Sequence, residues 1–224
     1  MELPDWPHIR QMLRWAVPVS LESLFYTFLS MLTTRLVAGY GAGAVAAVDV
    51  GTQIESLSWL VGGGFGSAVT AFIGQNYGAR RQDRIDRCLK TSLAVMSVWG
   101  VLVSLALYFL GGPMFLVFLP DRSLLPVAVL YLRIMAFSEF FLCVEGMLSG
   151  AFRGCGQTRQ PATASICANI TRVLMAYALS RTPLGLAGVF WGITISTDLR
   201  VIWIGAWYFK TRRSFACGPA EVAA

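Results

Sequence analysis

The sequence predicts an all-α fold, a polytopic membrane protein built as a bundle of six transmembrane helices. Hydrophobic residues make up 56% of the 224 residues, charged residues only 13%, and the mean hydropathy is +0.62. An average soluble domain is less apolar and carries more charge. Apolar stretches long enough to cross a bilayer core, which takes about 20 residues per helix, fill almost the whole chain. These stretches cover residues 16–38, 43–73, 92–112, 124–148, 161–179 and 184–209. The chain therefore divides into a lead-in (1–15), a six-helix transmembrane lobe (16–209) and a tail (210–224).

The first two predicted spans differ in how they begin and in their length. Pro18 opens the first span, where the missing N–H of proline does no harm. The residues before it are polar and aromatic and lack the apolar core of a signal peptide, so we expect an amphipathic segment on the inner membrane surface. The second span, over residues 43–73, is longer than a perpendicular crossing needs. Its glycine-rich run 62–66 has two interpretations, close helix packing through small residues or a functional hinge.

Proline and glycine bound the later spans. The third span ends at the Gly-Gly-Pro sequence 111–113. The apolar residues 114–120 after it are too few to cross a bilayer, so we expect an interfacial turn on the outer side. Pro126 and Pro161 open the fourth and fifth spans. No further domain is predicted.

The distribution of basic residues predicts the orientation, because short exported loops disfavour Lys and Arg. With the N-terminus inside, the inner segments carry the basic residues of 10–14, 80–90, 153–159 and 210–213. The outer loops carry only Arg122 and Arg181. We therefore expect a multi-pass protein of the inner or plasma membrane with both termini in the cytoplasm.

The sequence does not predict an enzyme, a metal site or nucleic-acid binding. It has no phosphate-binding glycine loop, no GxSxG and no HExxH, and its basic residues form no face with interleaved aromatic residues. The cysteines share no CxxC or Cys/His spacing, so we assign no disulfide; they are Cys88, Cys143, Cys155, Cys167 and Cys217. We expect no cofactor, and energy for transport would come from a gradient of protons or sodium ions.

Ionisable side chains within the spans are candidates for function, because a charge at membrane depth is costly unless it is neutralised, paired or hydrated. Glu22 and Tyr26 lie one turn apart in the first span. Asp49 and Gln53 share a face of the second span, and Glu55 points at least a quarter turn away from that face. The glutamates have no obvious cation in their own helices, so they either line a cavity and bind a proton or cation or serve the structure. The candidates for ion or substrate binding are Glu22, Tyr26, Asp49, Gln53, Glu55 and Glu139.

Other charged residues in the spans are interpreted as ion pairs that fix helix packing. The expected pairs are Asp198 with Arg172 or Arg200, and Glu145 with Arg153 or Arg159. These residues are candidates for a structural role rather than for binding.

Three runs of residues carry a resemblance to a known family of membrane proteins. The first is residues 36–84, which include AAVDVGTQIESLSWL and GQNYGA. The second is residues 146–161, GMLSGAFRGCGQTRQP, and the third is residues 186–197, LAGVFWGITIST. In this order they resemble the first and second helices, the arginine-glycine turn between the fourth and fifth helices, and the last helix of one lobe of the multidrug and toxic compound extrusion (MATE) family, most closely its C-terminal lobe.

The resemblance implies a function as well as a fold. Family members have two related lobes that rock about a central cavity and export organic cations in exchange for protons or sodium ions. This chain resembles one lobe only. The implied partners are a second six-helix lobe, either another copy or a separate chain, the lipid bilayer, and a small cationic or amphipathic substrate. The acidic residue that some members carry in the first helix of the second lobe aligns with Tyr26, one turn from Glu22. The aspartate that some carry before the arginine-glycine turn aligns near Leu142, between Glu139 and Glu145.

The leading hypothesis is therefore a subunit of a multidrug efflux antiporter that is coupled to protons or sodium ions and works by rocking of two lobes. Two alternatives stay open. A flippase for lipid-linked oligosaccharides would need a cavity lined by arginines; the available ones are Arg35, Arg133, Arg172 and Arg200. An inactive, truncated half-transporter would fold in lipid and move nothing.

Overall fold

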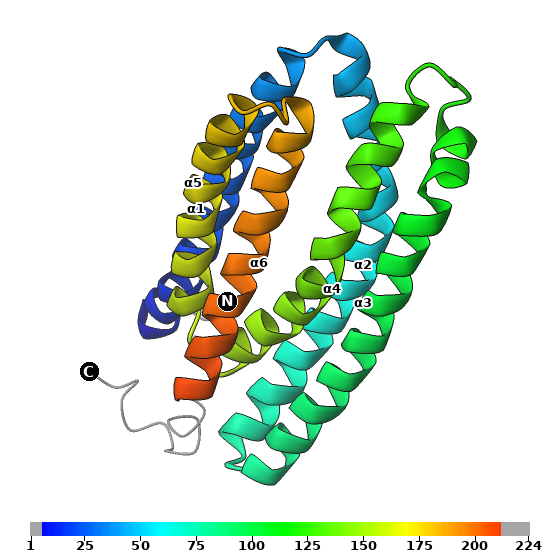
Figure 1. Ribbon diagram of the computed structural model, residues 1–224. Coiled ribbons are helices and arrows are strands. Elements are labelled where there is room, and N and C mark those ends of the chain that lie inside the picture. The colour runs from blue at the N-terminus through cyan, green and yellow to red at the C-terminus, as the bar shows by residue number, and fades with distance from the viewer. Residues whose placement is uncertain (1–5, 212–224) are drawn as a thin grey trace, which may run out of the picture.

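The computed structural model describes residues 6–211, and within this range the chain forms six α-helices and no β-strand (Figure 1). The helices are α1 (Trp6–Ala38), α2 (Ala42–Gly78), α3 (Gln82–Phe118), α4 (Leu125–Gly154), α5 (Arg159–Ser180) and α6 (Leu186–Thr211). All six are long and apolar enough to cross a membrane. The predicted fold class is thus confirmed. Most of the predicted tail, with Arg212, Arg213 and Cys217, lies outside the described residues, as do residues 1–5.

The helices form two groups of three. α4 packs along both α2 and α3, and α5 packs along both α1 and α6. Contacts between α4 and α6 join the groups, whereas α1 and α2 touch little although they are adjacent in sequence. The start of α1 and the end of α6 lie at the same end of the bundle (Figure 1). The two groups therefore leave room between them along part of their length.

Small residues bring α2 and α4 into close contact. A Cβ atom built on Gly66 would lie 2.9 Å from the carbonyl oxygen of Gly146, and one built on Gly150 would lie 2.5 Å from the carbonyl oxygen of Gly66. The Thr70 hydroxyl donates a hydrogen bond across this contact to the Gly150 carbonyl oxygen at 3.0 Å. Small residues let membrane helices approach through their backbones in this way. Close packing is therefore a role of the glycine-rich run 62–66, and α2 continues through it without a break.

α1 differs from the prediction at its N-terminal end. The sequence predicts a separate surface segment before Pro18, but the described part of it, residues 6–15, belongs to α1. The physical reason is that positions 8–17 contain no glycine or proline and are mostly good helix formers. Pro18 therefore lies inside the helix, which membrane helices tolerate because neighbouring groups or water can satisfy the carbonyl that the proline frees.

α3 is longer than predicted at both ends. It begins at Gln82 and runs through the Gly-Gly-Pro sequence 111–113 to Phe118, so the predicted interfacial turn directly after this sequence is wrong. The reason is packing against α4. A Cβ atom built on Gly111 would lie 3.1 Å from the side chain of Leu132, so this glycine allows a close approach of two helices instead of ending one.

Candidate functional site

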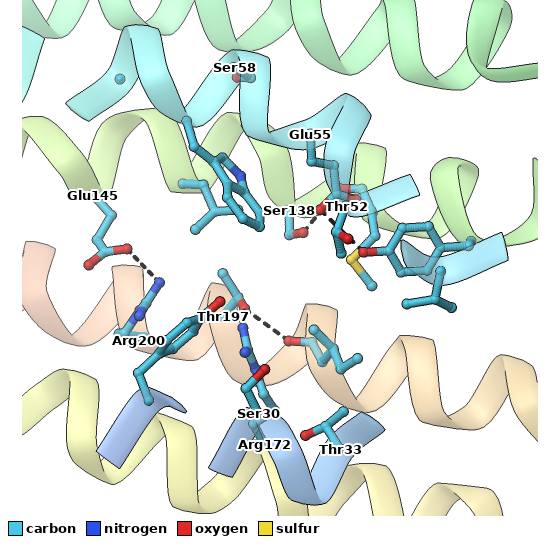
Figure 2. A pocket seen from close by; sticks show the side chains of 18 of the residues that line it. Ser30, Thr33, Thr52, Glu55, Ser58, Ser138, Glu145, Arg172, Thr197 and Arg200 are labelled. Carbon is cyan, nitrogen blue, oxygen red and sulfur yellow. Dashed lines mark hydrogen bonds and ion pairs between the residues drawn. The ribbon is translucent and has the colours of Figure 1, made fainter. Parts of the chain in front are cut away.

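A cavity of about 520 Å³ lies between the two helix groups, within the membrane-spanning part of the bundle (Figure 2). Pockets for small molecules typically have volumes of about 300–1,000 Å³. All helices except α3 contribute to its wall. The polar and aromatic residues of the wall are Tyr26, Ser30, Thr33, Thr34, Asp49, Thr52, Glu55, Ser58, Trp59, Tyr131, Ser138, Glu145, Arg172, Thr197 and Arg200.

The α2 wall carries the carboxylates of Asp49 and Glu55, with Thr52 between them. Glu55 is only 3% exposed. Its Oε2 accepts a hydrogen bond from the Tyr131 hydroxyl at 3.3 Å, and its Oε1 has no partner among the described residues. Six residues separate Asp49 from Glu55, which turns the two side chains about 120° apart around the helix, in agreement with the prediction. Both nevertheless line the same cavity, which is wide enough to reach across this part of α2.

Most of the α4 wall is one row of side chains that sequence reasoning did not recognise as a cavity wall. The row is Tyr131, Met135, Ser138, Leu142 and Glu145, and Cys143 and Gly146 lie beside it. Alternating steps of four and three residues mark one face of a helix. The signal was present in the sequence, but the row mixes apolar and polar side chains and so resembles ordinary core packing.

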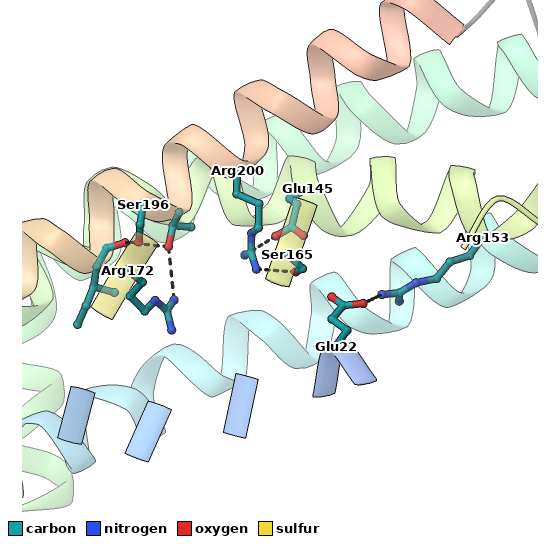
Figure 3. A network of polar contacts seen from close by, with 9 residues as sticks. Glu22, Glu145, Arg153, Ser165, Arg172, Ser196 and Arg200 are labelled. Atoms are coloured by element: carbon teal, nitrogen blue, oxygen red, sulfur yellow. Dashed lines mark hydrogen bonds and ion pairs between the residues drawn. The ribbon is translucent and has the colours of Figure 1, made fainter. Parts of the chain in front are cut away.

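The wall formed by α5 and α6 is basic. Arg172 of α5 places its guanidinium carbon 5.7 Å from the centre of the Tyr26 ring and donates from Nη2 to Thr197 Oγ1 at 3.5 Å. Arg200 of α6 forms an ion pair with Glu145, with 2.6 Å between Nη2 and Oε2 (Figure 3). The carboxylate of Glu145 therefore neutralises Arg200 within the wall.

Three predicted binding residues do not line the cavity. Glu22 lies nearer the start of α1, where its Oε2 is 3.5 Å from Arg153 Nη2 (Figure 3). Gln53 is exposed and is not among the residues that line the cavity, although it lies one turn from Asp49. Glu139 is 1% exposed; the side chains of Ser58 and Trp59 are its polar neighbours, but no hydrogen bond of ordinary geometry joins them to its carboxyl oxygens. Of the predicted binding candidates, Tyr26, Asp49 and Glu55 come together in the cavity.

The predicted choice of ion-pair partners is also wrong. Glu145 pairs with Arg200 of α6 and not with Arg153. Neither Asp198 nor Arg172 forms an ion pair within residues 6–211, and the Oδ1 atom of Asp198 is buried without a hydrogen bond there. The physical reason is that α4 packs against α6, a contact that separation along the chain does not reveal.

The cavity wall combines charges of both signs with aromatic rings. No group of three or more His, Cys, Asp or Glu side chains in the described part of the chain could hold a metal ion. The cavity instead offers two carboxylates on α2, a guanidinium without a carboxylate partner on α5, and the aromatic rings of Tyr26, Trp59 and Tyr131. A small molecule with charged and apolar parts would find a complementary group for each.

Comparison with known proteins gives a consistent result. The sequence profile of the MatE family matches residues 18–178. The protein of Brucella suis named "Probable multidrug resistance protein NorM" is 31% identical over 166 residues, which cover 70% of this chain and 35% of that protein. The protein of the same name from Thermotoga maritima is 23% identical over 192 residues, which cover 85% of this chain and 41% of that protein.

Two solved structures share the fold. A MATE protein in complex with MaL6 matches with a TM-score of 0.87 at 20% identity, covering 95% of this chain and 49% of that one. A MOP superfamily transporter from Pyrococcus furiosus matches with a TM-score of 0.84 at 18% identity, covering 96% of this chain and 48% of that one. The chain thus spans less than half the length of each of these relatives.

Proposed function

Because this chain belongs to the MatE family and is a multi-pass membrane protein, we propose that it is one lobe of a multidrug efflux antiporter. In this proposal it moves small cationic or amphipathic compounds out of the cell in exchange for protons or sodium ions. A second lobe, either another copy or a separate chain, completes the transporter. The lobes rock to open the binding site to each side of the membrane in turn.

The observation that carries the proposal is the cavity with carboxylates at membrane depth. Glu55 is held by one hydrogen bond from Tyr131 and keeps one carboxyl oxygen without a partner among the described residues. A carboxylate placed in this way binds either a coupling ion or the cationic part of a substrate, but not both at once. Competition for one group couples the two movements, because binding of the ion favours release of the substrate. The rings of Tyr26 and Trp59 supply faces on which an organic cation stacks.

The need for a second lobe is supported by length, since the named relatives are more than twice as long as the matched part. Two tagged copies of the chain, produced together and crosslinked in membranes, test for a homodimer.

The proposed orientation has both termini in the cytoplasm, because basic residues are in excess on the cytoplasmic side of membrane proteins. The basic residues of 80–90 and 153–159 then face the cytoplasm. The start of α1 and the end of α6 lie at the same end of the bundle, which supports this proposal (Figure 1).

The flippase alternative has less support. Of the arginines that would suit a lipid pyrophosphate, Arg35 and Arg133 lie outside the cavity.

Everted membrane vesicles from a host without its own drug exporters test the function. Uptake of ethidium is followed by fluorescence after a proton or sodium gradient is imposed. We expect Glu55→Gln to slow uptake by about tenfold or more, because a hydrogen bond to a charged group contributes about 1.5–3 kcal/mol. Gln53→Ala is the matched control, since Gln53 lies on the same helix but outside the cavity. Equal uptake by wild type and Glu55→Gln would refute the proposed role of the carboxylate. Vesicles that never exceed the empty-vector background, even with a crosslinked dimer present, would favour an inactive half-transporter.

A further inference from the structure

We infer that Arg172 is the residue of this cavity that binds an anionic group of the substrate, so that the cavity holds a zwitterionic amphiphile more tightly than the matching cation. The inference rests on the proposed function and names the class of substrate more closely. It follows from the distribution of charge over the cavity wall.

Arg172 is a cavity-lining cation that forms no ion pair with a carboxylate of the described residues. Its nearest polar contacts are with neutral groups, the Thr197 hydroxyl at 3.5 Å and the ring of Tyr26 at 5.7 Å. No carboxylate of residues 6–211 lies within 4.0 Å of its guanidinium group. A guanidinium carries five N–H donors, and a charge at this depth needs a counter-charge or water. Most of its donors are therefore available to a ligand.

Arg200, the second arginine of the wall, is neutralised by a carboxylate of the protein. Arg200 forms the ion pair with Glu145 at 2.6 Å and also donates to the Ser165 hydroxyl at 3.1 Å. Because its charge is balanced within the protein, Arg200 has few N–H donors available to a ligand. Arg172 lies on the neighbouring helix α5, and the anionic group of a ligand would balance its charge.

The opposite wall has the opposite charge. Figure 2 shows Glu55 of α2 on one side of the cavity and Arg172 on the other. Asp49 lies on the same helix as Glu55 and is exposed. A molecule that spans the cavity therefore meets carboxylates at one end and a guanidinium at the other. A purely cationic compound would pair with the carboxylates of the α2 wall but would supply no counter-charge to Arg172.

The chemistry of the two walls defines the ligand. The planar guanidinium pairs best with a carboxylate or a similar anion through two parallel N–H···O bonds. The cationic end faces Asp49 and Glu55, and the apolar middle packs against side chains such as Met135 and Ile193. An amphiphile with a carboxylate and a delocalised cation on one rigid ring system has these three features.

A dye pair that differs only in the anion tests the inference on the full chain in lipid nanodiscs. Rhodamine B carries a carboxylate and a delocalised cation, and its ethyl ester keeps the ring system and the cation without the carboxylate. Binding is measured by fluorescence anisotropy, with protein-free nanodiscs to correct for partitioning into lipid. We expect the wild-type chain to bind the zwitterion about tenfold more tightly than the ester, since charge-assisted hydrogen bonds are the strong ones.

The variants separate Arg172 from intramembrane arginines in general. Arg172→Gln should weaken binding of the zwitterion by about ten- to a hundredfold and leave the ester within about threefold. Arg133→Gln is the matched control, because Arg133 also lies over a tyrosine ring, that of Tyr108 at 5.5 Å, but outside the cavity. This control should change neither affinity. Arg172→Lys keeps the charge without the planar fork and should show an intermediate loss, which tests the inference if Arg172→Gln does not fold.

The outcomes are distinct from those of the efflux assay. A wild-type chain that binds the ester as tightly as the zwitterion would overturn the inference, whatever the variants do. So would an equal loss of both dyes in Arg172→Gln, which would show a structural role only. Because binding needs no transport, a chain that prefers the zwitterion but exports nothing would overturn the proposed function and leave the anion site in place.

Discussion

The contact between α2 and α4 makes a quantitative prediction about Gly150. A Cβ atom at this position would lie 2.5 Å from the carbonyl oxygen of Gly66 and 3.2 Å from the Thr70 hydroxyl. To restore the 3.4 Å of an ordinary contact, the two backbones must separate by roughly 0.9 Å. Gly150→Ala therefore forces two helices apart along a contact that now joins backbone to backbone.

The expected cost follows from two contributions. Overpacking of a tight core costs about 1–3 kcal/mol. The separation also weakens the hydrogen bond from Thr70 to the Gly150 carbonyl, and interhelical hydrogen bonds in membrane proteins average about 0.6 kcal/mol. We therefore expect Gly150→Ala to lower the free energy of unfolding by about 2–4 kcal/mol. Thr70→Val removes a hydroxyl that bonds both to Gly150 and to the Gly66 carbonyl within α2, and it should cost about 0.6 kcal/mol for the interhelical bond.

Reversible unfolding of the purified chain in mixed micelles, titrated with SDS and followed by circular dichroism, measures these differences. Gly64→Ala is the control, because a Cβ atom there meets nothing within 4 Å. It should be neutral or stabilise the helix by up to about 1 kcal/mol. If Gly150→Ala and Gly64→Ala have the same free energy of unfolding, the close contact of α2 and α4 does not exist as described.

Three further predictions concern single side chains. Glu139→Met should raise the free energy of unfolding by about 1–3 kcal/mol, because it removes a buried carboxyl group without a hydrogen bond of ordinary geometry among the described residues; a loss of stability in the same titration would contradict this. Glu22→Arg combined with Arg153→Glu should recover the stability that each single variant loses, about 1 kcal/mol or less for this partly exposed pair; a double variant no more stable than the singles would exclude the pair. Tyr131→Phe removes the hydrogen bond that holds Glu55 and should raise the dye concentration for half-maximal uptake about tenfold; wild-type uptake kinetics would exclude a positioning role.

Helix type and number could be predicted from the sequence because a membrane span must satisfy its backbone hydrogen bonds within itself. The ends of the helices could not. Pro18 and Pro113 look like boundaries in the sequence, yet both lie inside helices. In each case the chain around the proline continues the helix, and for α3 the packing of Gly111 against Leu132 supports it. Local propensity is a weaker determinant than the partner helix.

Contacts between helices were the part that sequence reasoning could not reach. Glu145 could be identified as a paired residue from its depth and charge, but its partner Arg200 lies on a different helix. The same holds for Arg172, which the sequence offers either as an ion-pair residue or as part of an arginine-lined cavity; it lines the cavity and forms no ion pair with a described residue. Both outcomes depend on how each helix is rotated about its own axis. That rotation is set by packing across the whole bundle, which no single stretch of sequence records.

The cavity itself follows from where the small residues lie. Gly66 and Gly150 draw α2 and α4 together, and Gly192 does the same for α6 against α5, where a Cβ atom would lie 2.6 Å from the Cα of Ala176. No comparable contact draws α1 to α2, which touch little. The pair α2–α4 and the pair α5–α6 are each tightly packed, whereas α1 and α2 make few contacts. A space therefore remains between the pairs, and the polar side chains along it fill it only partly. The glycines therefore shape the cavity from a distance, so a change at Gly150 should alter both stability and the position of Glu55 relative to Tyr131.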